Sequence, residues 1–545
     1  MKGIQDKVAI ISGGATLIGA AIAREFLRYG ASVVIADIDV QRGEALQAQL
    51  GGKARFVRTD LQRDQEIAHC VKDAMAAFGR IDFLVNVACC YDNAISSDRL
   101  APAASSINPI RDRSHGNRCP YLAFPLPPEG SPGEHLAPCR HPRLSLTRRF
   151  QPGRQLPELG LEPIPVEPCV SPEYFDRERE QVFMKTWLKV GRVEETPDTG
   201  DYKVKKIHFA KTSVILIHGK DGKIRGFHNT CSHRGNKVIV ESGEETFGRS
   251  KAAVVTCRFH GWVYDAQGQI AHVPEEERFS PCWEKASNGL TPVHTDVWEG
   301  FIFINLSREP VEALQDYPGG MGQHLAGYPF ASMNQCFSYH TKLDCNWKIA
   351  LDAFSEAYHV STIHAGSFPN AFSTGLADVA LFGDHRTTGI CLTLDATPTP
   401  IAAMANEITG ASLVAKRGAS MLPSSVNPSR REDFSFELSV VFPNILIHIS
   451  EGIWFTHQFW PIAHNRTLWE GKYYVPAPKT NSERWAVEFA QVLQRNAWLE
   501  DTATMEDTHA ALESGAKTHM VLQDEEILLR HGYKVLEQYM TAKPE

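Results

Sequence analysis

Two short patterns of cysteine and histidine constrain the fold of this chain more than any other feature. Cys231 and His233 flank one residue, Cys257 and His260 flank two, and a glycine follows each pair closely. Both pairs lie in loops between apolar, strand-like stretches. Four such ligands can serve one metal centre only if the chain between the pairs folds back on itself. The sequence therefore predicts a β-rich metal-binding domain in this region.

The four ligands fit two kinds of metal centre. A [2Fe–2S] cluster can take two thiolates on one iron and two neutral imidazoles on the other, which raises its reduction potential. A Cys2His2 zinc site uses the same residue types, but its paired ligands are usually further apart and a helix lies between the pairs. Here the intervening residues 234–256 are strand-like. The pattern favours the iron–sulfur cluster, and zinc is the alternative.

A second group of candidate ligands follows later in the chain. Two imidazoles and one carboxylate on Fe2+ leave coordination positions open for O2 and substrate. His359 and His364 are five residues apart, about 140° around an ideal helix, so binding one metal requires a helix end or a π-bulge between them. Glu356 and His359 are three residues apart and are expected to share a helix face. The group comprises Asn346-Trp347-Lys348, Asp352, Glu356, His359 and His364.

These motifs make residues 165–545 similar to one known family. Phe259–Asp265 resembles the cluster loop of Rieske proteins, and residues 346–364 resemble the Asn-Trp-Lys…Asp/Glu-x-x-His-x4-His pattern of Rieske non-haem iron aromatic ring-hydroxylating oxygenases, alpha subunit. The resemblance implies an all-β Rieske domain and an α+β catalytic domain of the helix-grip type with an antiparallel sheet. The chain departs from the pattern at Glu356, where dioxygenases commonly have Asp, and at Ala353, where some members have Asn.

The carboxylate ligand of the iron must come from another part of the chain. In the family it lies on a late helix, and the acidic stretch Trp498–Asp507 resembles the family's Glu-Asp signature. We predict that Asp501 is the third ligand beside His359 and His364, with Glu500 and Asp507 as lesser candidates. A solvated acidic helix face is the alternative interpretation.

The resemblance also implies cofactors and partners. It implies one [2Fe–2S] cluster, one mononuclear Fe2+, and electrons from NAD(P)H delivered by a ferredoxin, a flavin reductase or both. It implies a homotrimer, or an α3β3 assembly with a small β subunit, in which Glu356 bridges to a cluster histidine of the neighbouring subunit. Asn346, Asp352 and Glu356 are the catalytic candidates.

The reaction implied by the family uses O2 to hydroxylate a small organic molecule. We expect an aromatic or related substrate and cis-dihydroxylation, with monohydroxylation and demethylation open, and residues 365–425 shaping the substrate site. A Rieske electron-transfer protein without oxygen chemistry is the alternative.

The N-terminal stretch, residues 5–90, has a different pattern. Apolar runs alternate with helical stretches, which predicts a βαβαβαβ order and a parallel, Rossmann-like sheet. Gly13 and Gly19 lie in a turn where the backbone can approach a pyrophosphate, and Asp37 follows the second strand, where an acid can bind a ribose. The stretch resembles the start of short-chain dehydrogenases/reductases.

This resemblance is incomplete. Leu17 stands where the family has a phosphate-loop glycine, and Cys89 replaces the glycine of its Asn-Ala-Gly motif. The pattern stops before the later strands and the catalytic Ser and Tyr-x-x-x-Lys; Tyr202 and Lys206 have the right separation but lie in another domain. We therefore expect a truncated, inactive half-domain. NAD binding and an NAD-dependent dehydrogenase activity are the alternatives.

Composition completes the prediction of a multidomain chain. A net charge of −8 gives no signal for nucleic acid, no segment reads as a membrane span or a secretory signal, and twelve scattered cysteines indicate a reducing cytoplasm. Pro, Arg, Ser and His accumulate before the Rieske region, which is typical of a disordered linker. The expected divisions are a Rossmann-like segment, the linker, the Rieske domain and the catalytic domain: 1–93, 94–165, 166–325 and 326–545.

Overall fold

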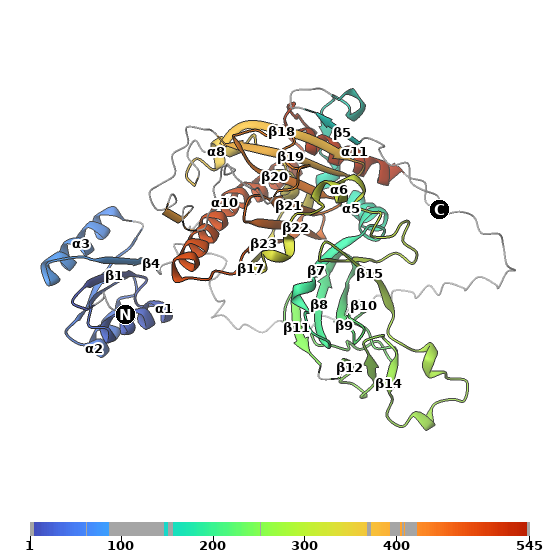
Figure 1. Ribbon diagram of the computed structural model, residues 1–545, viewed down its shortest axis with the longest axis horizontal. Helices are drawn as coiled ribbons and strands as arrows, with labels where there is room; N and C mark the ends of the chain where they lie inside the picture. Colours follow the sequence, from blue (N-terminus) through green and yellow to red (C-terminus); the bar gives the residue numbers. More distant parts are fainter. Residues whose placement is uncertain are drawn as a thin grey trace, which may run out of the picture. The chain divides into compact units, whose positions relative to one another are not determined.

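The computed structural model describes residues 5–61, 63–86, 147–150, 156–250, 252–367, 372–392, 404, 405, 408 and 422–541. The chain divides into two compact units, residues 1–131 and 132–545 (Figure 1). None of the helices within the described ranges combines the length and the apolar character that a membrane crossing needs. Cys89, residues 94–146 of the predicted linker and most of the predicted substrate loops between 393 and 421 lie outside the described residues.

The first unit is a parallel four-stranded sheet with helices on both faces. The strand order is β3-β2-β1-β4, and every strand pair is parallel. Apolar residues of α1 and α2 pack on one face, and Cys70 and Ala74 of α3 pack on the other. The predicted Rossmann-like order is confirmed. Its elements are β1 (Val8–Ser12), α1 (Leu17–Arg28), β2 (Ser32–Asp37), α2 (Val40–Leu50), β3 (Ala54–Arg58), α3 (Asp64–Phe78) and β4 (Phe83–Asn86).

The second unit contains the predicted β-rich metal-binding region. A seven-stranded antiparallel sheet has the order β11-β8-β9-β10-β15-β16-β7, and a three-stranded sheet has the order β12-β13-β14. The loop with Cys231 follows β10, and the loop with Cys257 joins β12 to β13. The strands are β7 (Leu188–Arg192), β8 (Asp201–Ile207), β9 (Thr212–His218), β10 (Ile224–His228), β11 (Glu245–Arg249), β12 (Val254–Thr256), β13 (Val263–Asp265), β14 (Ile270–His272), β15 (Pro292–Trp298) and β16 (Phe301–Asn305).

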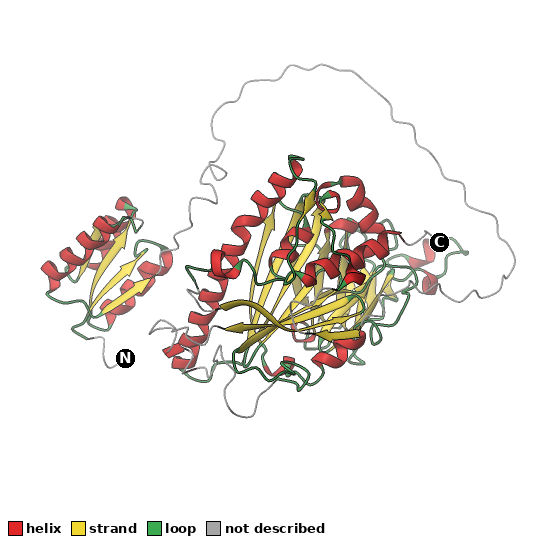
Figure 2. Ribbon diagram, turned by 90° about the horizontal axis from the view of Figure 1, so that it is seen from above, coloured by secondary structure: helices red, strands yellow, loops and turns green. Residues whose placement is uncertain are grey.

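An eight-stranded antiparallel sheet follows, with the order β17-β23-β22-β21-β20-β19-β18-β5. Its long strands lie together in Figure 2. A small pair, β6 (Ile164–Pro165) and β24 (His519–Met520), lies outside it. The strands of the large sheet are β5 (Thr147–Phe150), β17 (Gln335–Leu343), β18 (Phe372–Phe382), β19 (His385–Leu392), β20 (Phe434–Val441), β21 (Ile445–Ile449), β22 (Trp454–Ala463) and β23 (Arg466–Val475).

The helices that position the candidate ligands pack on one face of this sheet. The 33-residue helix α10 starts with a capping box between Thr480 and Glu483, and its Trp498 packs edge-on against Phe455 and Trp469. The predicted antiparallel sheet with a long helix is confirmed. The helices are α4 (Glu167–Val170), α5 (Pro172–Glu178), α6 (Gly319–Leu325), α7 (Trp347–Ala353), α8 (Val360–Ile363), α10 (Asn481–Glu513) and α11 (Ile527–Thr541).

Buried charges join the seven-stranded sheet to the eight-stranded sheet. Lys205 of β8 pairs with Glu470 of β23, and Lys472 of β23 pairs with Glu195. Lys203 of β8 lies 2.7 Å from Glu195, so that carboxylate links both sheets. Charges removed from water persist only when they are paired. The orientation of one sheet on the other is therefore fixed by specific contacts as well as by apolar packing.

Two sequence expectations need correction. The sequence from Phe434 to Ser450 reads as one long antiparallel strand, because it is rich in apolar and β-branched residues. The structure divides it into β20 and β21, because Pro443 has no N–H to donate to a neighbouring strand. The predicted linker is also shorter at its C-terminal end. Residues Thr147–Phe150 form β5, which pairs with the edge strand β18, and Leu156, Leu159 and Ile164 are buried. Backbone pairing to an open sheet edge requires no particular side chains, so composition did not reveal it.

A buried hydrogen bond joins α7 to α11. The hydroxyl of Tyr533 in α11 donates a 2.8 Å hydrogen bond to the carboxyl of Asp352 in α7. The Sγ atom of Cys169 lies 3.2 Å from the same hydroxyl oxygen. Burial raises the pKa of Asp352 from 3.8 to about 7, although the hydroxyl of Tyr533 works in the opposite direction. The folded protein therefore holds a proton on Asp352 that the unfolded chain releases at lower pH.

The substitution Asp352→Asn should change how stability depends on pH. In the wild type, the protonated carboxyl of Asp352 raises the free energy of unfolding. This contribution is fully present below about pH 4 and is lost as the pH rises through about 7, and it amounts to on the order of 4 kcal/mol. The variant has no such proton, so its stability relative to the wild type should improve steadily over this window. Urea unfolding at successive pH values measures the difference. An unchanged difference from pH 4 to pH 7, as expected for the exposed control Asp524→Asn, would contradict this assignment.

Candidate metal centres

The two cysteine loops share one backbone conformation. The N–H of Cys231 donates to the carbonyl five residues later over 2.8 Å, and the N–H of Gly235 donates back to the carbonyl of Cys231 over 2.9 Å. Cys257 and Gly261 make the same two bonds over 2.8 and 3.0 Å. Gly235 and Gly261 have φ values of 75° and 74°, in the left-handed region that favours glycine. The glycine after each pair is therefore required by the turn.

The loops place like ligands together. His233 Nδ1 and His260 Nδ1 are 3.1 Å apart, and both imidazoles are partly exposed. The two cysteines are buried beneath them, and the hydroxyl of Tyr264 lies 3.0 Å from the Sγ atom of Cys231. Two inner thiols and two outer imidazoles fit a centre with one sulfur-ligated and one nitrogen-ligated iron. The outward histidines leave that side of the centre accessible to an electron partner.

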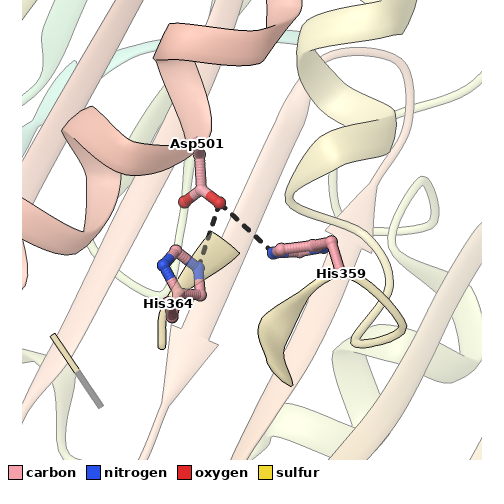
Figure 3. A group of neighbouring side chains, drawn as sticks. All are labelled: His359, His364 and Asp501. Atoms are coloured by element: carbon pink, nitrogen blue, oxygen red, sulfur yellow. Dashed lines mark ion pairs between the residues drawn. The ribbon is translucent and has the colours of Figure 1, made fainter. Parts of the chain in front are cut away.

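The second ligand group converges on a single point. His359 is the N-cap of the short helix α8 and His364 is its C-cap, so the two histidines flank a helix that is one turn long. Asp501 reaches them from the middle of α10, with its Oδ1 3.2 Å from His359 Nε2 and 3.0 Å from His364 Nε2 (Figure 3). The three ligand atoms lie within 4.8 Å of one another. A helix end, one of the two predicted solutions, brings the histidines together.

The arrangement fits a divalent metal better than a set of ordinary hydrogen bonds. Asp501 Oδ1 is buried and accepts no hydrogen bond of acceptable geometry. Burial raises the pKa of Asp501, but the two imidazoles outweigh it and lower the pKa below its ordinary value. Burial likewise disfavours the His359 imidazolium, but Asp501 and Glu356 raise the pKa of His359 to about 10. Two imidazoles and an ionised carboxylate leave the open positions that Fe2+ needs for oxygen chemistry.

Each metal-facing imidazole is oriented by an outer carboxylate. Glu356 accepts a hydrogen bond from His359 Nδ1, and Glu500 lies 2.9 Å from His364 Nδ1. Ser367 donates to the other oxygen of Glu500 over 2.8 Å. Such partners fix the tautomer and the ring orientation, so that Nε2 keeps its lone pair for the metal. The sequence marked Glu500 as a possible ligand; its contact with His364 depends on tertiary structure.

The other predicted residues lie in different places. Glu356 is in the turn between α7 and α8, so the expectation of a shared helix face with His359 is wrong, because α7 ends at Ala353. Asn346 caps α7, and its side chain donates to the carbonyl of His464 over 2.6 Å. Asp352 binds Tyr533 and is not part of the ligand triad. Asp507 is exposed on α10.

The N-terminal candidates form a closed turn. Asp37 accepts hydrogen bonds from the N–H groups of Ala15 and Asp39 over 2.9 and 3.0 Å, so both carboxylate oxygens already have donors. A Cβ on Gly19 would lie 2.2 Å from the carbonyl oxygen of Gly13, which shows how closely the turn packs on the helix start. This packing explains Gly19, and a φ of 65° explains the glycine at position 13, in both cases without a ligand. NAD binding by Gly13, Gly19 and Asp37 stays a prediction.

Comparisons with family models agree with the three regions. Residues 186–292 match the Rieske [2Fe–2S] domain, and residues 330–542 match the ring hydroxylating alpha subunit, catalytic domain. Residues 7–104 match the short chain dehydrogenase family. The two iron-binding matches contain all the candidate iron ligands. The third covers the parallel sheet of the first unit.

Similar proteins include oxygenase subunits with different substrates. The carnitine monooxygenase oxygenase subunit of Escherichia coli (strain K12) is 31% identical over 35% of this chain and 49% of its own length. The 2-aminobenzenesulfonate 2,3-dioxygenase subunit alpha of an Alcaligenes species is 33% identical over 34% of this chain and 46% of its own length. The chain therefore spans about half the length of the curated relatives it matches.

A solved structure shows the same fold over most of the chain. It belongs to a quaternary ammonium Rieske monooxygenase, described for carnitine oxidation and inter-subunit electron transfer. The match has a TM-score of 0.55 and 18% identity, and it covers 70% of this chain and 95% of that one.

The substitution Glu500→Gln should weaken iron binding at the triad without unfolding the protein. A neutral amide holds the His364 ring less firmly, and changes to such outer partners typically cost 10–100-fold in metal affinity. Competition between the protein and a chelator for Fe2+ measures the loss. The matched control is Asp507→Asn, which removes an exposed acid from the same helix. Equal iron affinities for both variants would contradict the orienting role of Glu500.

Proposed function

We propose that this chain is the catalytic subunit of a Rieske-type oxygenase. Its residues 186–292 belong to the Rieske [2Fe–2S] domain family. Its residues 330–542 belong to the catalytic-domain family of ring hydroxylating alpha subunits. We place the Rieske domain at 166–325 and the catalytic domain at 326–545. One observation carries the proposal: a single compact unit holds two separate ligand sets. A Rieske domain alone relays electrons, whereas the triad supplies open coordination positions.

The proposed chemistry divides the work between the two ligand sets. Cys231, His233, Cys257 and His260 would hold a cluster that supplies single-electron transfer, and the triad would hold Fe2+, which supplies O2 activation. The chain's own residues hold this machinery in place. His359 and His364 present Nε2 to one point, and Glu356 and Glu500 keep the protons on the opposite nitrogens. Asp501, carried on the long helix α10, supplies the negative charge that balances the metal.

We propose an assembly in which the cluster ligands of one copy would lie beside the iron triad of the next, so that electrons would cross between subunits. Glu356 lies beside His359, and next to it Tyr358 is 60% exposed. Phe259, next to the cluster ligand His260, is 56% exposed. Large apolar side chains exposed beside both centres favour a contact that covers them. Glu356 would then bridge the two centres in a homotrimer or an α3β3 assembly. A ferredoxin, a flavin reductase or both would supply the electrons.

The substrate that we propose is a small aromatic molecule, converted by cis-dihydroxylation. Phe455, Tyr473 and Trp469 are buried and pack on Trp498, one helical turn before Asp501, so the triad has aromatic, apolar surroundings on this side. Apolar surroundings favour an apolar ring as the substrate. The similar alpha subunit for 2-aminobenzenesulfonate supports an aromatic substrate.

A second candidate is monooxygenation of a quaternary ammonium compound. The similar E. coli subunit has carnitine as its named substrate. Both candidates use the same iron chemistry and differ in the bond that is attacked.

For the first unit we propose no hydride chemistry. Tyr202 and Lys206, which have the separation of the dehydrogenase pair, lie on β8 of the second unit. The turn of the first unit satisfies its own acid, Asp37, through backbone N–H groups. We propose that residues 1–93 are a truncated, inactive half-domain.

Product analysis with 18O2 distinguishes these candidates. The iron-loaded full-length protein, supplied with NADH and a general reductase and ferredoxin, is tested on aromatic acids, polycyclic hydrocarbons, carnitine and glycine betaine. Our proposal predicts an aromatic cis-diol that contains two labelled atoms, and no product from His359→Ala. Labelled products from the quaternary ammonium compounds alone would replace the aromatic proposal with the second candidate. Turnover that persists in His359→Ala would refute both.

A further inference from the structure

The C-terminal end of α10 carries a second group of metal-ligand side chains. His509 and Glu513 are one helical turn apart, and His464 lies in the short turn between β22 and β23. Glu513 Oε1 is 3.4 Å from His509 Nε2 and 3.6 Å from His464 Nε2. Two imidazoles from distant parts of the chain therefore approach one carboxylate oxygen, as His359 and His364 approach Asp501.

His509 is the most informative member of this group. Its side chain is only 3% exposed, and neither ring nitrogen makes a hydrogen bond of acceptable geometry. Buried polar groups are almost always satisfied, so an imidazole with two unmatched nitrogens requires a partner. By contrast, the buried His457 accepts a hydrogen bond from Trp469.

We propose that His464, His509 and Glu513 form a binding site for a divalent transition-metal ion of the zinc type, separate from the two iron centres. Two imidazole nitrogens and a carboxylate oxygen are ligands that Zn2+ and Co2+ prefer, with water at the remaining position. The three atoms are less closely gathered than those of the iron triad. The side chain of His464 is 25% exposed on its turn, so it can rotate inward and close the site.

The position of the site assigns it a structural role. Asp501 lies two turns earlier on the same helix, about 12 Å along its axis. The carbonyl of His464 accepts the hydrogen bond from Asn346, which caps α7. A metal held by His464, His509 and Glu513 would thus fasten the β22–β23 turn to α10. This turn also contacts the start of α7 through Asn346, so the metal would stabilise both helices near the iron triad. Its loss should loosen these elements without removing any iron ligand.

Cobalt titration of the iron-loaded full-length protein tests the site. Co2+ is the probe because its visible absorption reports nitrogen and oxygen ligands. We expect one high-affinity equivalent of Co2+ in addition to the bound iron, together with a rise in melting temperature. His464→Ala and Glu513→Gln should each lose this equivalent and the temperature rise, whereas the exposed control His519→Ala should keep both.

A further variant separates this site from the iron triad. His359→Ala, which damages the iron triad, should still bind the additional Co2+ with unchanged affinity, so failure of the proposed oxygenase function would leave the result intact. The inference is overturned if the wild type binds no Co2+ beyond its iron. It is also overturned if His464→Ala, folded by circular dichroism, binds as much Co2+ as the wild type, or if the equivalent disappears with His359.

Discussion

The buried carboxylate of Asp501 is the point on which the second unit depends. It lies in the middle of a long helix and approaches two imidazoles that flank a helix only one turn long. A charge in this position is tolerated only because both rings face it, and each ring is in turn fixed by another carboxylate. The position of α10 on the sheet is therefore constrained by the chemistry of the triad as well as by the packing of Trp498.

The large sheet serves a different purpose on each face. One face packs aromatic side chains against α10 and α7, close to the triad, and includes the buried His457, whose pKa burial lowers to about 3. The other face carries Glu470, which pairs with Lys205 of β8, and Lys472, which lies 3.5 Å from Glu245 of β11. Successive side chains along β22 and β23 point to opposite faces of the sheet. One face is therefore apolar and lies near the iron triad, and the other forms ion pairs with the Rieske region.

The sequence predicted what is encoded locally. The two cysteine loops were recognisable because spacing and a following glycine define each turn, and the parallel sheet of the first unit followed from its alternating pattern. The spacing of His359 and His364 required a helix end, and the structure has one. The roles of acids depend on distant contacts. Glu500 and Asp501 are neighbours in sequence, yet they contact opposite nitrogens of the His364 ring. Glu500 contacts Nδ1, which points away from the triad centre, and Asp501 contacts Nε2, which faces the centre. Likewise, no local pattern links His464 to His509, or β5 to the edge of β18.

The central claim is that two sets of side chains hold two independent iron centres. Mössbauer spectroscopy of the 57Fe-loaded protein tests it most directly, combined with the variants Cys231→Ser and His359→Ala. We predict two signals in the wild type, a paired one from the cluster and a single-iron one from the triad. Cys231→Ser should lose only the first and His359→Ala only the second. A wild type without the single-iron signal, or a loss of both signals in His359→Ala while the protein stays folded, would contradict the account.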